Sequence, residues 1–83
     1  MMPLAKAQLT DILDSCQFIQ VVCHDQTFDQ YCDNRMLRRA VEREFEIIGE
    51  GLKRLRDAEP DILETITAAH AIIGFRNRLA HGY

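Results

Sequence analysis

The C-terminal segment of the sequence gathers the side chains that are best suited to chemistry. Eight residues hold a guanidinium (Arg76), an amide (Asn77), an imidazole (His81) and a phenol (Tyr83). On a helix, residues four apart share a face, so Asn77 and His81 would lie together, and the long side chain of Arg76 would reach the same place. A phosphate bound there would meet a permanent cation and a group that titrates near neutral pH.

Helix termination offers a second interpretation of the same segment. Basic side chains and histidine are favoured in the last turn of a helix, where they meet the negative end of its dipole. Gly82 is a residue type at which helices commonly stop. The local pattern therefore leaves both a catalytic site and an ordinary helix end open.

Two other candidate sites are weaker. His24 follows Cys23 directly, and we interpret it as a helix-end residue, because the chain has no cluster of histidines, cysteines or carboxylates at metal-ligand spacing. Gly49-Glu50-Gly51 follows a helical pattern instead of a strand, so it fails the context test for a nucleotide-binding loop. We expect these glycines to allow a second helix to approach closely. No metal and no cofactor is predicted.

Length and composition predict one small soluble domain, residues 1–83. The chain has 83 residues, of which 47% are hydrophobic and 28% charged. So short a chain buries a modest fraction of its surface, and oligomerisation is the reinforcement we expect. Three cysteines, an odd number without framework spacing, are interpreted as reduced core thiols. The sequence has no signal-peptide pattern and no membrane-spanning run, so we predict a cytoplasmic protein that does not enter a membrane.

The charge distribution is uneven. The net charge of −3 argues against a sequence-blind coat for nucleic acid. The segment 35–56 nevertheless has more cations than anions, and Arg39 and Arg43 lie within it. Together with Arg76 and Arg78 they could form a basic rim that binds RNA, or they could belong to a solvated helix face with internal ion pairs.

Apolar periodicity predicts three long helices and no strand. The first runs from Leu4 to about His24, with Pro3 in its first turn, and its apolar stripe includes Leu13. Residues 25–34 are expected to be a connector with one helical turn, which Thr27 caps. The second helix begins at a cap at Asp33 or Asn34 and runs to about Ala58.

The expected apolar face of the second helix consists of Met36, Leu37, Ala40, Val41, Phe45, Ile48, Leu52 and Leu55. Pro60 ends that helix, and Asp61 is expected to cap a third one, which carries the apolar pattern to Leu79. The predicted fold class is all-α, an up-and-down helical bundle.

Two segments of the chain resemble a known family. The first is Glu46-Ile47-Ile48-Gly49-Glu50, followed by Lys53-Arg54-Leu55, and the second is the run from Gly74 to Tyr83. Together they are similar to the HepT-type ribonuclease toxins of the HEPN superfamily. The family's motif of Arg, four residues, His, one residue and Tyr is matched by Arg76, His81 and Tyr83. The family's pattern continues beyond the Tyr with a further helix that this sequence lacks, which we expect to leave an apolar face in need of a partner.

The resemblance implies metal-independent cleavage of RNA by a homodimer, with Arg76 and His81 as catalytic residues and Asn77 beside them. Two protomers would supply the two imidazoles that a base and an acid require. It also implies the toxin role of a toxin–antitoxin pair, in which a cognate nucleotidyltransferase antitoxin adenylylates Tyr83. The alternative is a truncated, catalytically inactive helical module that dimerises or binds a nucleotidyltransferase.

Overall fold

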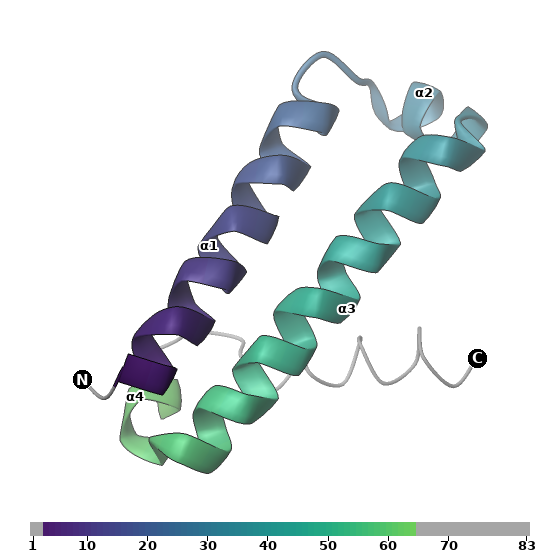
Figure 1. The fold of residues 1–83 in the computed structure, drawn as a ribbon. Coiled ribbons are helices and arrows are strands. Elements are labelled where there is room, and N and C mark those ends of the chain that lie inside the picture. The colour runs from purple at the N-terminus through teal and green to yellow at the C-terminus, as the bar shows by residue number, and fades with distance from the viewer. Residues whose placement is uncertain (1–2, 65–83) are drawn as a thin grey trace.

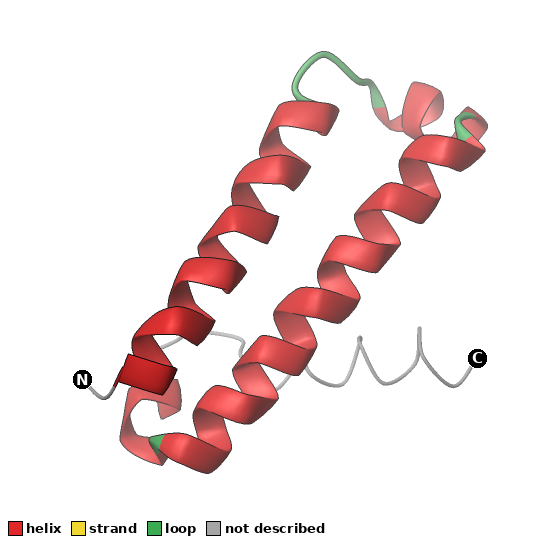
Figure 2. Ribbon diagram, viewed as in Figure 1, coloured by secondary structure: helices red, strands yellow, loops and turns green. Residues whose placement is uncertain are grey.

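The computed structural model describes residues 3–64, and every regular element in this range is a helix (Figure 2). The helices are α1 (Pro3–Cys23), α2 (Phe28–Asp33), α3 (Arg35–Ala58) and α4 (Pro60–Glu64). α1 and α3 run antiparallel and pack on each other, with α2 at the connection between them and α4 at the other end of α3 (Figure 1). The all-α prediction is confirmed. Of the third predicted helix, only the beginning lies within the described residues.

Local signals set most of the helix boundaries. Pro3 is the first described residue of α1, and proline suits a first turn because its φ angle is already fixed and it has no N–H to lose there. Thr27 accepts a hydrogen bond from the Gln30 N–H at 3.1 Å, and the Gln30 side chain accepts one from the Thr27 N–H at 2.9 Å, so the two form a capping box. Asn34 caps α3 by accepting from the Leu37 N–H at 3.0 Å. Both predicted caps are confirmed.

The predicted cap of the next helix is wrong by two positions. Asp61 does not precede α4 but lies in its first turn, and Pro60 is the first helical residue. Glu59 joins the two helices, because its N–H donates to the Leu55 carbonyl at 2.8 Å while its carbonyl accepts from the Ile62 N–H at 3.1 Å. A residue that precedes proline avoids helical backbone angles, and Glu59 has φ −143° and ψ 82°.

The core lies between α1 and α3. Val41, Ile48, Leu52 and Leu55 of α3 are buried, and Ile48 and Leu52 pack against partly buried side chains that come mainly from α1. Those side chains are Ile12, Cys16, Ile19 and Phe45. Removal of this apolar surface from water is the main source of stability for the helix pair.

Two residues assigned to the apolar stripes are exposed instead. Met36 is 85% exposed and Leu13 is 57% exposed. Met36 lies five residues before the buried Val41, which turns it by about 140° from that residue. Leu13 is turned by about 100° from the buried-side residue Ile12. Ala5 and Ser15 are buried on α1 although neither was assigned to its stripe.

The cysteine prediction is correct for two of the three thiols. Cys16 and Cys23 are half-buried, whereas Cys32 is exposed, so its assignment to the core is wrong. All three are free thiols. Cys32 lies in the short helix α2, none of whose residues is buried.

Gly49-Glu50-Gly51 lies inside α3, so the rejection of a nucleotide-binding loop is confirmed. At Gly51 the two long helices approach each other closely. A Cβ atom at this position would lie 2.8 Å from Cγ1 and 3.1 Å from Cδ1 of Ile12. Among the helices of residues 3–64, none combines the length and apolar character that crossing a bilayer requires.

Candidate functional site

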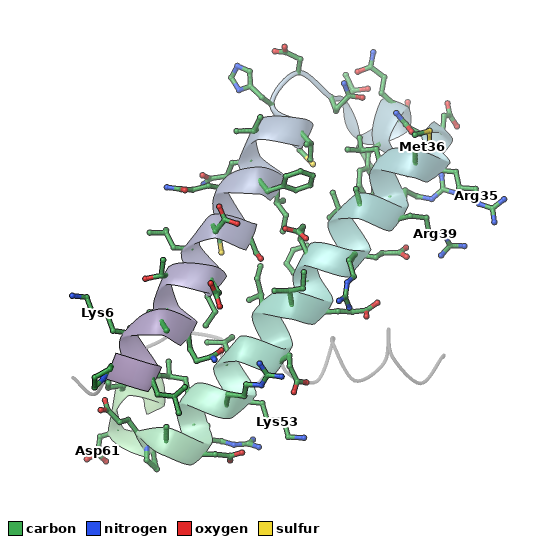
Figure 3. All side chains as sticks on the ribbon, viewed as in Figure 1. Lys6, Arg35, Met36, Arg39, Lys53 and Asp61 are labelled. Carbon is green, nitrogen blue, oxygen red and sulfur yellow. The ribbon has the colours of Figure 1, made fainter. Side chains whose placement is uncertain are left out.

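The described residues of the predicted site are Arg39 and Arg43, whose side chains are exposed along α3. Figure 3 shows Arg39 projecting from α3 on the side away from α1. Arg39 Nη1 lies 3.1 Å from Glu42 Oε2, and Arg43 Nη1 lies 3.4 Å from Glu46 Oε2. The arginine side chains are 66% and 69% exposed, while the glutamates are 27% and 29% exposed. Each guanidinium group therefore pairs with a less exposed carboxylate, and much of each arginine side chain stays open to solvent.

The same pairing continues at the other end of the helix. Arg54 Nε lies 3.6 Å from Glu50 Oε1, one turn away. The segment is thus a solvated helix face with ion pairs three and four residues apart, which is one of the two interpretations left open by the sequence. Arg35 and Lys53 are exposed on this face (Figure 3), five turns or about 27 Å apart.

Surface ion pairs of this kind are worth about 0–1 kcal/mol each. A phosphate group can therefore replace a glutamate as the partner of Arg39 or Arg43 at small cost. The arrangement allows a role in RNA binding. The ion pairs with glutamates also account for the presence of Arg39 and Arg43 without such a role.

A groove lies between the first half of α1 and α3. It has a volume of about 220 Å³ and is lined by Gln8, Asp11, Arg43, Glu46, Ile47, Glu50, Gly51 and Arg54. Three carboxylates and two guanidinium groups line it, so its formal charge is slightly negative. Because carboxylates surround Arg43 and Arg54 here, the groove by itself is not a phosphate-binding site.

Tyr31 is a half-buried phenol near the connection of α2 to α3. Burial raises the pKa of the Tyr31 hydroxyl above its ordinary value of 10.0, and the negative charge of Glu42 raises it further. Tyr31 is therefore a neutral phenol at physiological pH. Arg38 donates a hydrogen bond to the Cys32 carbonyl nearby, which ties the first turns of α3 to α2.

His24 follows α1 directly and is 80% exposed, with Nε2 3.6 Å from Asp25 Oδ1. Its interpretation as a helix-end residue agrees with this position. Within residues 3–64, no group of three or more histidine, cysteine or acidic side chains is arranged to hold a metal ion.

The central residues of the predicted site lie outside the described residues. These are Arg76, Asn77, Arg78, His81 and Tyr83. Their mutual geometry stays a prediction. Sequence reasoning missed the glutamate partners of Arg39 and Arg43 as individual pairs, although the spacing of three residues was a readable signal.

The fold and this face define an all-α protein built on a long antiparallel helix pair with an ion-paired basic helix. A family model described as "Ribonuclease HepT-like" matches residues 12–83. The chain therefore belongs to the HepT-like ribonuclease family of the HEPN superfamily, which confirms the resemblance drawn from its motifs.

One curated relative is a protein of Methanocaldococcus jannaschii named "Putative RNase MJ1380". It is 32% identical to this chain over 78 residues, which cover 94% of this chain and 71% of the relative. No solved structure matches significantly.

Proposed function

We propose that this protein is a metal-independent endoribonuclease that acts as a homodimer. The observation that carries the proposal is the family match, which extends through residue 83 and so includes the whole Arg76, His81 and Tyr83 motif. The name of the curated relative, which describes an RNase, supports the same activity.

The proposed chemistry uses the nucleophile that RNA itself contains. The 2′-hydroxyl attacks the neighbouring phosphorus, and the bond to the departing 5′-oxygen breaks, which leaves a 2′,3′-cyclic phosphate. His81, with an ordinary pKa near 6.5, removes the first proton or supplies the last one, and each task is worth about 10²–10⁴ in rate. The second task falls to His81 of the other protomer.

Arg76 is proposed to bind the non-bridging phosphate oxygens through two parallel hydrogen bonds. Such a contact, if it strengthens as charge builds up on the phosphate, contributes on the order of 10²–10³ in rate. Asn77, four residues before His81, is proposed to donate to the phosphate or to orient the imidazole.

Arg78, Arg39 and Arg43 are proposed as contacts to the RNA backbone away from the scissile bond. The exposure of Arg39 and Arg43, and the low cost of exchanging their glutamate partners for phosphates, support this role. Such contacts attract RNA of any sequence.

The proposed biological setting is the cytoplasm, where the protein acts as the toxin of a toxin–antitoxin pair. The cognate antitoxin is proposed to be a nucleotidyltransferase that adenylylates Tyr83. The added phosphate would place negative charge two residues from His81 and repel the RNA backbone.

The test is a cleavage assay with the purified chain, RNA and excess EDTA. We expect new 2′,3′-cyclic phosphate ends from the wild-type protein and their loss in His81→Ala. His24→Ala is the matched control, because His24 is an exposed histidine with no assigned role, and it should cleave as the wild type does. Equal background from wild type and His81→Ala would refute the nuclease.

The alternative function is a binding module that dimerises or binds a nucleotidyltransferase without cutting RNA. Exposed apolar side chains on α1, such as Leu13 and Val21, favour a protein contact of some kind. A chain that forms a stable complex but yields no cyclic phosphate ends would support this alternative.

A further inference from the structure

The groove between α1 and α3 has an apolar floor and polar groups around its rim. Gly51 is buried and Ile47 is half-buried, so these two residues form the floor, while Asp11, Arg43 and Arg54 are exposed at the rim. Gln8 is half-buried, and its Oε1 atom lies 3.6 Å from the position that a Cβ atom of residue 51 would take. A planar group that enters the groove therefore meets apolar surface below it and hydrogen-bonding groups at its edge.

The carboxylates of the groove differ in their partners. Glu46 lies 3.4 Å from Arg43, and Glu50 lies 3.6 Å from Arg54, so both have a guanidinium partner. No residue within 3–64 forms an ion pair with Asp11. Asp11 therefore presents both of its carboxylate oxygens to a ligand, and a carboxylate is purely an acceptor of hydrogen bonds.

The size of the groove limits what it can hold. Its volume of about 220 Å³ is below the range of sites for drug-sized ligands, which begins at about 300 Å³. A single aromatic ring system suits this space better than a whole nucleotide with its charged phosphate. The slightly negative charge of the lining also favours a neutral group that donates hydrogen bonds.

The groove opens next to one of the proposed contacts to the RNA backbone. Arg43 lines the groove and is 69% exposed, so it can bind a phosphate at the rim. The bases of single-stranded RNA can turn out of the stack, and proteins read them through the hydrogen-bonding groups of their edges. A strand whose phosphate is bound to Arg43 can therefore place a neighbouring base in the groove.

Guanine is the base whose edge matches Asp11. Its N1–H and its N2 amino group are adjacent donors, so the two carboxylate oxygens can accept two parallel hydrogen bonds. Adenine and cytosine each place a ring nitrogen acceptor beside their amino group, and uracil has one donor between two carbonyl oxygens. Each of these bases would therefore hold an acceptor against a carboxylate oxygen.

Two further side chains of the lining fit the same base. The Gln8 amide can donate to the O6 carbonyl of guanine, which lies next to N1–H. Arg54 is 62% exposed, and the plane of a guanidinium group is a surface on which a base can stack.

We propose that the groove between α1 and α3 is a base-binding site that selects guanine in single-stranded RNA, with Asp11 as the residue that determines the specificity. The inference rests on the proposed function for the presence of bound RNA, and it names a sequence preference for that RNA. Binding is measured without cleavage, so the two can be tested separately.

The first experiment measures the binding of RNA decamers to the full chain with His81→Ala, which keeps the RNA intact. Fluorescence anisotropy compares an all-uridine decamer with decamers that carry one central guanosine, inosine or 7-deazaguanosine. We expect guanosine and 7-deazaguanosine, which share the same N1–H and N2 amino groups, to bind about 10-fold or more tighter than all-uridine RNA. Inosine, which lacks the N2 amino group, should bind more weakly than guanosine.

The second experiment adds Asp11→Asn or Asp14→Asn to the same chain. Asp14 is the matched control, because it is an exposed aspartate one turn further along α1 that does not line the groove. Asp11→Asn should remove the preference for guanosine, since an amide NH₂ would face a donor of the base. Asp14→Asn makes the same change in net charge and should keep the preference. Circular dichroism checks that both variants keep their helices.

The outcomes separate this inference from the nuclease. Equal affinity for the guanosine and all-uridine decamers, or a guanosine preference that survives Asp11→Asn, overturns the base-binding site and leaves the nuclease untouched. A guanosine preference that depends on Asp11, in a protein whose wild type produces no cyclic phosphate ends, supports the base-binding site and overturns the nuclease. A chain that binds none of the decamers overturns the base-binding site.

Discussion

The side chain of Ile12 lies directly against Gly51, where an added methyl group would come within 2.8 Å of Ile12 Cγ1. This contact joins the middle of α1 to α3 and sets how closely the two long helices approach. Glycine inside a helix costs about 0.5–1 kcal/mol relative to alanine, so its presence requires a compensating gain in packing.

Replacement of Gly51 by alanine is expected to destabilise the fold by about 1 kcal/mol. Overpacking against Ile12 costs about 1–3 kcal/mol, which exceeds the gain in helix propensity. Urea unfolding measures the difference. In an Ile12→Ala background the clash is gone, so Gly51→Ala should become stabilising by about 0.5–1 kcal/mol. The same sign in both backgrounds would show that Ile12 does not limit the approach.

Removal of the Thr27 side chain is expected to cost about 1 kcal/mol, because Thr27→Ala leaves the Gln30 N–H without its capping oxygen. Thr10→Ala is the control. Thr10 also makes a side-chain hydrogen bond, but to the Lys6 carbonyl within α1, where alanine is the better helix former. Equal destabilisation by both variants in urea unfolding would contradict a specific capping role.

Stability is expected to fall at high pH through Tyr31. Its pKa in the folded protein lies above the ordinary value of 10.0, so its contribution is fully present below pH 10 and is lost as the pH rises through the folded value. Urea unfolding between pH 8 and about 11 should therefore show a steeper loss in the wild type than in Tyr31→Phe, which cannot ionise there. Parallel curves would exclude Tyr31 as the source.

Loss of Arg39 or Arg43 is expected to weaken RNA binding without a change in sequence preference. Each phosphate contact removed should lower the slope of log K against log salt by about 0.7 for single-stranded RNA. Arg39→Gln and Arg43→Gln can be compared with Lys53→Gln, which removes one positive charge from the same helix at a position with no assigned RNA contact. An identical salt slope in all three variants would show that only the net charge of the protein matters and that Arg39 and Arg43 make no specific phosphate contact.

Tyr83 is the expected site of adenylylation. Co-expression with a cognate nucleotidyltransferase should add one or more adenylyl masses to the intact chain and abolish RNA cleavage, and Tyr83→Phe should stay unmodified under the same conditions. The other tyrosine, Tyr31, is half-buried and should carry no added mass when peptides are analysed. An unmodified wild-type chain would argue against regulation by this route.

Local chemistry made part of this structure readable from the sequence. Thr27 and Asn34 cap their helices through side chains that reach backbone N–H groups three residues away, so nothing distant is needed to predict them. Such signals also misled at the start of α4. Asp61 was predicted to cap this helix, but the helix already begins at Pro60, so Asp61 lies inside its first turn.

The family could also be predicted from the sequence, because the motif with Arg76, His81 and Tyr83 lies within one short segment. The structure was needed to show that Arg39 and Arg43 pair with Glu42 and Glu46. Spacing allowed both a basic rim and an ion-paired face, and the rotamers of exposed side chains are not set by spacing alone.

Tertiary packing decided which side of each helix is buried. Leu13 and Met36 belong to apolar patterns, yet both are exposed, because the direction from which α1 and α3 meet each other selects one stripe among several possible ones. Sequence periodicity determines that a helix is amphipathic, and it predicted that a glycine would allow a close approach. Only the three-dimensional register between two segments nearly forty residues apart selected Ile12 as the side chain that occupies the space over Gly51.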